Sequence, residues 1–101
     1  MSEVLLSWEE RSEGRVATLT VSNPGRLNIL SSAVLESFES GIEELACAVG
    51  LRVVIVRGAG ERAFIGGADV GELAELTPDT ARAFISSVHR VCQGLRDLPV
   101  P

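Results

Sequence analysis

A run of four apolar residues, Val53, Val54, Ile55 and Val56, is the sequence feature that most restricts the fold. It lies within the segment 52–58 and does not alternate with polar residues, which is typical of a strand covered on both faces by helices. A segment of helical periodicity precedes it, and a strand-like segment precedes that helix. Strand, helix and strand in this order predict a crossover unit with parallel strands and an α/β fold.

Two segments at the start of the chain alternate between apolar and polar residues. Residues 4–10 and 15–22 therefore predict two strands, and residues 12–14 predict the turn between them. Asn23, Pro24 and Gly25 break the second strand. The chain thus begins with a predicted hairpin that leads into the crossover unit.

The helix of the crossover unit is predicted to begin at Ser31 or Ser32 as N-cap and to end at Gly50. Its apolar positions follow helical spacing: Leu35, Phe38, Ile42, Leu45 and Val49.

Two further helices are predicted after the strand at 52–58. Asp69 can cap a short helix with Glu72 at its third position, and Thr77 followed by Pro78 begins a longer one. The apolar stripe of the longer helix is Ala81, Phe84, Ile85, Val88, Val91, Cys92 and Leu95.

Composition and charge exclude several classes of protein. With 46% hydrophobic and 23% charged residues in 101 positions, the chain is typical of a single globular domain. A net charge of -5 argues against a nucleic-acid binder. Cys47 and Cys92 lie in helical patterns, so we expect both to be small core residues of a protein in a reducing compartment. Residues 1–8 contain no signal peptide or membrane span, so we expect a cytoplasmic protein without a membrane partner.

The glycine-rich segment 58–69 allows three interpretations. Residues 58–63 satisfy the dinucleotide-binding spacing G-x-G-x-x-A, although Gly66 and Gly67 interrupt the helix that this motif requires. The glycines could also form only a tight connection between strand and helix, with Asp69 as an N-cap. In the third interpretation the backbone from Gly66 to Asp69 leaves at least one N–H group free to bind a carbonyl oxygen that becomes negative during a reaction.

Several motifs, in order, resemble the crotonase or enoyl-CoA hydratase/isomerase superfamily. Asn23-Pro24-Gly25-Arg26-Leu27-Asn28-Ile29-Leu30 resembles its N-P-x-x-x-N-x-L loop, and residues 58–69 resemble its G-x-G-x-x-A-F-x-x-G-A-D segment. The resemblance covers nearly the whole chain. It implies the N-terminal part of a ClpP/crotonase-type spiral of strand-strand-helix units, so that residues 1–101 form a partial domain without the C-terminal half.

The resemblance also implies site residues. The N–H of Ala68 would be one of two oxyanion-hole donors to an acyl-CoA thioester oxygen, and Gly66 and Gly67 would shape the pocket. Arg26 and Leu27 match a CoA-contacting position, and Arg26 could pair with a CoA phosphate. Asp69 is included among the substrate- and CoA-binding residues and would support the loop through local hydrogen bonds. Arg62 could add positive potential beside the loop.

The activity implied by the resemblance is hydration of a 2-enoyl-CoA through a stabilised thioester enolate. The second oxyanion donor and the acid/base carboxylates of the family follow beyond Pro101, so this chain alone is predicted to be inactive. The alternatives are an isomerase, a dehalogenase, a thioester hydrolase, or a non-catalytic acyl-CoA-binding or interaction module. No cofactor or metal is expected beyond the CoA of the substrate, and the complete protein would form a homotrimer or hexamer.

The remaining ionisable residues are assigned no chemical role. Glu72 and Asp79 lie at helix starts, and nothing places Glu75 against a substrate. His89, the only histidine, is expected on the flank of the last helix with one face buried. Its distance from Pro101 also resembles that of the histidine in the dehalogenase branch, so both interpretations stay open.

Overall fold

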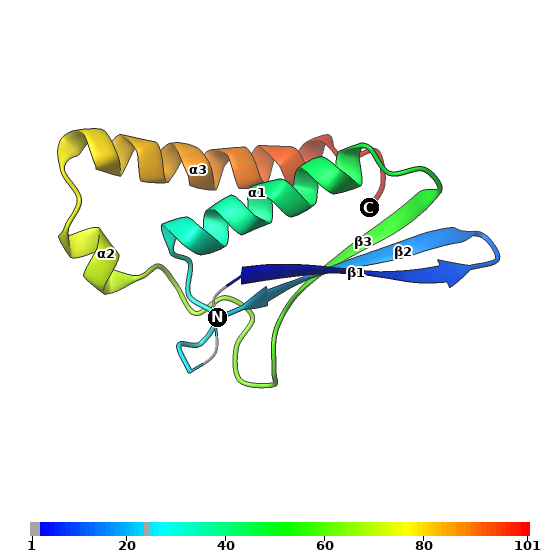
Figure 1. The fold of residues 1–101 in the computed structure, drawn as a ribbon, viewed down its shortest axis with the longest axis horizontal. Coiled ribbons are helices and arrows are strands. Elements are labelled where there is room, and N and C mark those ends of the chain that lie inside the picture. The colour runs from blue at the N-terminus through cyan, green and yellow to red at the C-terminus, as the bar shows by residue number, and fades with distance from the viewer. Residues whose placement is uncertain (1–2, 24) are drawn as a thin grey trace.

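The computed structural model describes residues 3–23 and 25–101, which form a small sheet and three helices (Figure 1). The helices and the sheet form two layers, with the helices on one side of the sheet. In chain order the elements are β1 (Glu3–Arg11), β2 (Gly14–Ser22), α1 (Ser32–Ala46), β3 (Leu51–Gly58), α2 (Val70–Ala74) and α3 (Pro78–Asp97).

The three strands lie in the order β1-β2-β3. β1 and β2 form an antiparallel hairpin with Trp8 opposite Ala17, and β2 pairs with β3 in parallel with Thr18 opposite Ile55. α1 connects the two parallel strands, so the predicted crossover unit is confirmed. Because β2 and β3 run in the same direction, the loops that follow them leave the same end of the sheet, away from the hairpin turn (Figure 1).

The core lies between the sheet and α1, and α3 packs against α1. β2 contributes fully buried side chains at alternate positions, which is the period expected of a strand with one covered face. α1 contributes one apolar stripe, and α3 packs beside α1 with fewer buried residues. The buried apolar residues are Val4, Ala17, Leu19, Val21, Val34, Leu35, Phe38, Ile42, Leu45, Phe84 and Val91.

The prediction that β3 is covered on both faces is wrong. Arg52, Ile55 and Arg57 are exposed, and Ile55 keeps 47% of its surface accessible, because helices cover only one face of the sheet. At the edge of β3 that faces away from β2, the N–H of Val54 donates to the carbonyl of Pro101 (2.9 Å). The end of the described chain therefore lies beside β3.

The end of α1 also differs from the prediction. The helix stops at Ala46 with Cys47 as its C-cap, and Val49 is 86% exposed beyond it. Gly50 adopts a positive φ of 78° and turns the chain into β3 instead of ending the helix. Val49 fits the helical spacing of the apolar residues, so the sequence pattern extends beyond the last residue of α1.

Both cysteines are exposed, so their prediction as core residues is wrong. Cys47 lies outside the buried stripe because the helix has already ended there. Cys92 faces an apolar cavity of about 250 Å³ between α3, α1 and β3 that no described segment fills. Ile85 is likewise exposed on α3, although it was expected on the apolar stripe.

The predicted helix starts are confirmed. Ser31, Asp69 and Thr77 each accept a hydrogen bond from a backbone N–H three residues later, which satisfies a donor that the first turn leaves free. Thr77 and Thr80 form a reciprocal capping box. Among the helices of the described ranges, none has the length and apolar character needed to cross a membrane.

Replacing Leu35 by alanine tests the α1 contribution to the core. Leu35 is 1% exposed, so we expect the substitution to lower the free energy of unfolding by about 2–5 kcal/mol. Ile85→Ala is the control, because Ile85 is a half-exposed apolar side chain on a helix and should change stability by only about 0.5 kcal/mol. Urea unfolding followed by circular dichroism measures both, and equal losses would contradict the core described above.

Candidate functional site

Two loops meet at the end of the sheet where β2 and β3 finish. The loop at 25–30 and the glycine-rich loop at 59–69 are joined by three backbone hydrogen bonds. Gly66 N–H donates to the carbonyl of Leu27 (2.8 Å), and Leu30 N–H donates to the carbonyl of Gly67 (2.7 Å). Asp69 N–H then donates to the carbonyl of Leu30 (2.8 Å), which makes a parallel bridge between Leu30 and Ala68.

This bridge fixes the direction of the Ala68 N–H group. A trans peptide is planar, so its C=O and N–H point in opposite directions. Because the Gly67 carbonyl points toward Leu30 N–H, the N–H of Ala68 in the same peptide must point away from Leu30. Within residues 3–23 and 25–101, no atom accepts a hydrogen bond from it. The bend therefore presents the Ala68 N–H as an oriented amide donor.

The two glycines before Ala68 are each required by the backbone. A Cβ on Gly66 would lie 2.7 Å from the carbonyl oxygen of Leu27, so a side chain there would separate the two loops. Gly67 has a φ of 140°, a conformation that other residues rarely adopt. The close approach of the loops and the bend before Ala68 thus both depend on the absence of side chains.

Asn28 holds the two loops together from the buried side. Its Nδ2 donates to the carbonyls of Ala59 (2.9 Å) and Ala63 (3.0 Å), and its Oδ1 accepts from Asn23 N–H (3.1 Å). Asn28 is 5% exposed and has a φ of 54°, a conformation in which asparagine is enriched. Leu27 shares this left-handed conformation at a cost of about 1–2 kcal/mol, so the contacts around it must hold it there.

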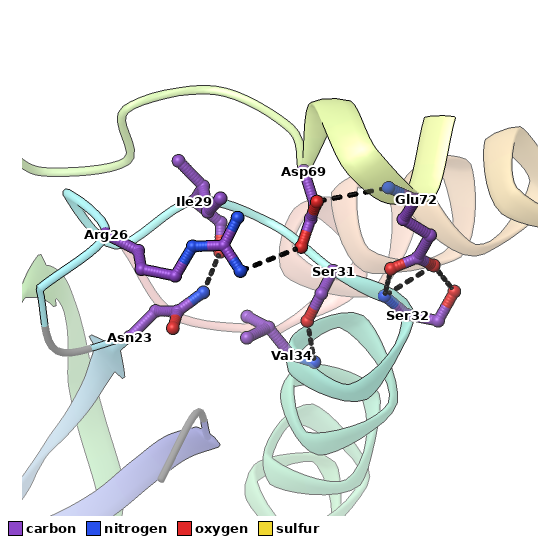
Figure 2. Close-up of polar contacts among 8 residues, drawn as sticks. All are labelled: Asn23, Arg26, Ile29, Ser31, Ser32, Val34, Asp69 and Glu72. Atoms are coloured by element: carbon purple, nitrogen blue, oxygen red, sulfur yellow. Dashed lines mark hydrogen bonds and ion pairs between the residues drawn. The ribbon is translucent and has the colours of Figure 1, made fainter. Parts of the chain in front are cut away.

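Arg26 and Asp69, both predicted to bind CoA, contact each other (Figure 2). Arg26 Nη1 lies 3.3 Å from Asp69 Oδ2, while Asp69 Oδ1 accepts from Glu72 N–H at 3.1 Å. The Asp69 side chain is only 15% exposed, whereas that of Arg26 is 54% exposed. Arg26 can therefore reach an external anion, and Asp69 is committed to contacts within the protein.

Glu72 has a role that the sequence did not reveal. Its carboxylate accepts from the backbone N–H of Ser32 (3.0 and 3.1 Å) and from the Ser32 hydroxyl, as Figure 2 shows. A carboxylate at the first turn of α1 is favoured by the helix dipole and by the unpaired N–H groups there. Glu72 was expected only to assist the start of its own short helix; instead it joins α2 to α1.

A cleft of about 260 Å³ lies between residues 23 and 25–28 of the first loop region and residues 59–63 of the glycine-rich loop. Leu27 and Arg62, both exposed, contribute to opposite walls of it. The structure therefore brings most of the predicted site residues to one end of the sheet: Arg26, Leu27, Arg62, Gly66, Gly67, Ala68 and Asp69. Pro24 of the same motif lies outside the described residues.

The dinucleotide interpretation of residues 58–63 is wrong. No helix begins within this motif, because the next helix starts only at Val70, and a pyrophosphate would find no helix N-terminus. His89 is exposed on α3 and does not have the half-buried setting expected of it. In the part of the chain that the structure describes, no group of three or more potential ligands could hold a metal ion.

The family model described as enoyl-CoA hydratase/isomerase matches residues 16–101. The chain belongs to this family. The match includes both loops of the site, so the resemblance found in the motifs and the crotonase-like fold class predicted from it are confirmed. Of the three interpretations of the glycine-rich segment, dinucleotide binding is excluded, and the tight connection and the oxyanion donor remain.

Curated relatives and solved structures agree with this assignment. The chain is 35% identical to the short-chain-enoyl-CoA hydratase of Clostridium acetobutylicum over 89 residues, which are 88% of this chain and 34% of that enzyme. It superposes on an enoyl-CoA hydratase/carnithine racemase of Magnetospirillum magneticum with a TM-score of 0.86 and 30% identity, over 100% of this chain and 37% of that one. An enoyl-CoA hydratase of Mycobacterium smegmatis gives a TM-score of 0.83 at 30% identity, over 96% and 37% of the two chains. The chain thus spans about a third of the length of these proteins.

Replacing Asn28 tests whether its amide holds the loops together. Asn28→Ala leaves two carbonyls and one N–H without their partner, so we expect a loss of about 1–3 kcal/mol in the free energy of unfolding. Asn28→Asp should lose at least as much, because a carboxylate would face two carbonyl oxygens.

The control for this test is Gln93→Ala, which removes an exposed amide that donates to Asp97 on the same helix. It should cost no more than about 0.5 kcal/mol in urea unfolding. If Asn28→Ala costs as little as the control, the amide is not the link between the loops.

Proposed function

We propose that this chain is the acyl-CoA-binding portion of an enoyl-CoA hydratase/isomerase-type enzyme. The bend at 66–69 binds the thioester oxygen and stabilises the enolate, most directly for the addition of water to a 2-enoyl-CoA. Membership of the family and the oriented N–H of Ala68 support this proposal. The relative from Clostridium acetobutylicum is described as a short-chain-enoyl-CoA hydratase, which favours hydration among the reactions open to this family.

The single observation that carries the proposal is the amide of Ala68, which has no acceptor among the residues that the structure describes. A donor held by a rigid bend costs no reorganisation when negative charge develops on the oxygen, so it stabilises the transition state more than the substrate. Polarising the thioester carbonyl makes carbon 3 of an enoyl group electrophilic and also stabilises the enolate that follows attack. The amide thus serves addition, elimination and double-bond migration alike.

The CoA portion of the substrate is assigned to the neighbouring loop. Arg26 is half exposed and could bind a phosphate while one of its nitrogen atoms stays near Asp69. Leu27 is 48% exposed beside the cleft and offers an apolar surface to the adenine or pantetheine part. Arg62 on the opposite wall adds positive charge to an otherwise acidic protein. No cofactor other than the CoA of the substrate enters this proposal.

The carboxylates near the bend do not act as acids or bases in this proposal. Asp69 is held by Glu72 N–H and Arg26, and Glu72 is held by Ser32. A carboxylate with such fixed partners is a poor proton carrier, so in this proposal other groups deliver the water and the protons. This favours a second candidate for the isolated chain, an acyl-CoA-binding module without catalysis. Isomerase, dehalogenase and thioester hydrolase remain alternatives for the complete protein, because all use the same enolate stabilisation.

Removing the N–H of Ala68 should abolish most of the activity. Ala68→Pro in the product of the complete coding sequence deletes the donor, and we expect kcat for hydration of crotonyl-CoA to fall about 10²- to 10³-fold. The loss of ultraviolet absorbance of crotonyl-CoA measures the rate.

Val70→Pro is the control for this substitution, two positions further along. Val70 is the first residue of α2 and 76% exposed, and Asp69 before it is already extended, so proline is tolerated there. Equal activity of the two proline variants would contradict the role of the Ala68 amide.

The isolated 101-residue chain should bind acyl-CoA without turning it over. Isothermal titration with crotonyl-CoA should show binding, weakened in Arg26→Gln, while the same preparation leaves the crotonyl absorbance unchanged. Arg96→Gln, on the far end of α3, is the matched control for loss of one positive charge. Turnover by the purified chain would show that it contains its own proton donor.

A further inference from the structure

Asp69, the residue after Ala68, is held by three separate contacts. Asp69 Oδ1 accepts from Glu72 N–H on α2, and Asp69 Oδ2 faces Arg26 on the other loop (Figure 2). The Asp69 N–H donates to the carbonyl of Leu30. Its side chain is largely buried, so neither oxygen is free to meet a ligand. Asp69 is thus the point at which α2 and both loops are joined.

These contacts bear directly on the orientation of the Ala68 amide. The carbonyl of the peptide before Ala68 accepts a hydrogen bond from Leu30 N–H, and the N–H of the peptide after Ala68 donates to the Leu30 carbonyl. Ala68 therefore lies between two peptides that are both bound to Leu30. Rotating Asp69 therefore twists the bridge on one side of Ala68, and Gly67 on the other side offers little resistance because it has no Cβ. The backbone hydrogen bonds to Leu30 set the direction of the Ala68 N–H, and the contacts of the Asp69 carboxylate add a further restraint next to it.

We propose that Asp69, through its ion pair with Arg26, is the positioning residue for the Ala68 amide. This rests on the proposed function, because the amide must be the oxyanion donor for its orientation to affect a rate. A half-exposed ion pair contributes little to global stability, so its effect is confined to the local geometry of the bend. Arg26 thereby links the loop assigned to CoA with the group assigned to the thioester oxygen.

Two substitutions remove the ion pair from opposite sides. Asp69→Asn keeps an oxygen that can accept from Glu72 N–H, and Arg26→Gln leaves the start of α2 untouched. Crotonyl-pantetheine, which carries no phosphate, serves as substrate so that a contact between Arg26 and CoA phosphate does not enter. Each variant of the complete gene product should lower kcat about three- to fivefold, with KM within about twofold of the unsubstituted protein.

The double variant decides whether the two residues act together. Asp69→Asn with Arg26→Gln should lower kcat no further than either single change, and Arg26→Lys should recover part of the loss. Glu75→Gln removes an exposed carboxylate at the end of α2 outside this set of contacts and should leave kcat unchanged. Multiplicative losses in the double variant, or single-variant kcat values within about twofold of the unsubstituted protein, would overturn the proposal.

An NMR measurement on this chain separates the positioning role from the proposed function. The amide resonance of Ala68 should shift in Asp69→Asn and in Arg26→Gln, and not in Glu75→Gln, while urea unfolding of all three stays close to that of the unsubstituted chain. Shifts at Ala68 without any hydratase activity in the complete product would reject the oxyanion function and keep the structural coupling. An Ala68 amide that is unmoved in both variants would reject the coupling itself.

Discussion

The hydrogen bond from Leu30 N–H to the Gly67 carbonyl is the interaction on which the site depends. It joins two loops that are far apart in the sequence, and through the planar peptide it also decides where the next N–H points. The other features of the site support it. Gly66 lets the backbones approach, Asn28 ties the loops on the buried side, and Asp69 continues the bridge.

In this arrangement the proposed chemistry at the bend does not depend on the identity of a side chain. The polar side chains around the bend are occupied with one another, as in the contacts of Arg26 with Asp69 and of Glu72 with Ser32. In the proposed function, the group that meets the thioester oxygen is a backbone amide, which every residue except proline possesses. Triads, metal ligands and paired carboxylates are therefore weak sequence signals for such a site, and the glycines that permit the bend are the more informative signal.

The sequence predicted those parts of the structure that are set locally. Helix starts at Ser31, Asp69 and Thr77 are recognisable because the capping residue and the N–H it binds are three positions apart. The pairing of β2 with β3 followed from the crossover pattern, and the family motifs located the bend at 66–69. The direction of the Ala68 N–H could not be derived from local sequence, because it is imposed by Leu30 from the other loop.

The predictions that were wrong concern burial, which depends on what covers a segment. Ile55 and Cys92 have the apolar neighbours of core residues, yet in the described structure no element packs over them. Val49 continues the helical period, but the helix ends before it. The contact of Glu72 with Ser32 spans 40 positions, and no local pattern indicates that a glutamate will bind the start of a distant helix.

That same contact has a consequence for the order in which the chain acquires its structure during synthesis. When α1 emerges from the ribosome, only the Ser31 hydroxyl is available to its first turn, and the carboxylate that completes it has not yet been translated. The early helix therefore begins with a frayed end that is secured only after α2 has been made and docked. The loop that carries Leu30 immediately precedes this end, and the bend at 66–69 can form its bonds to Leu30 only after the glycine-rich loop has also been made.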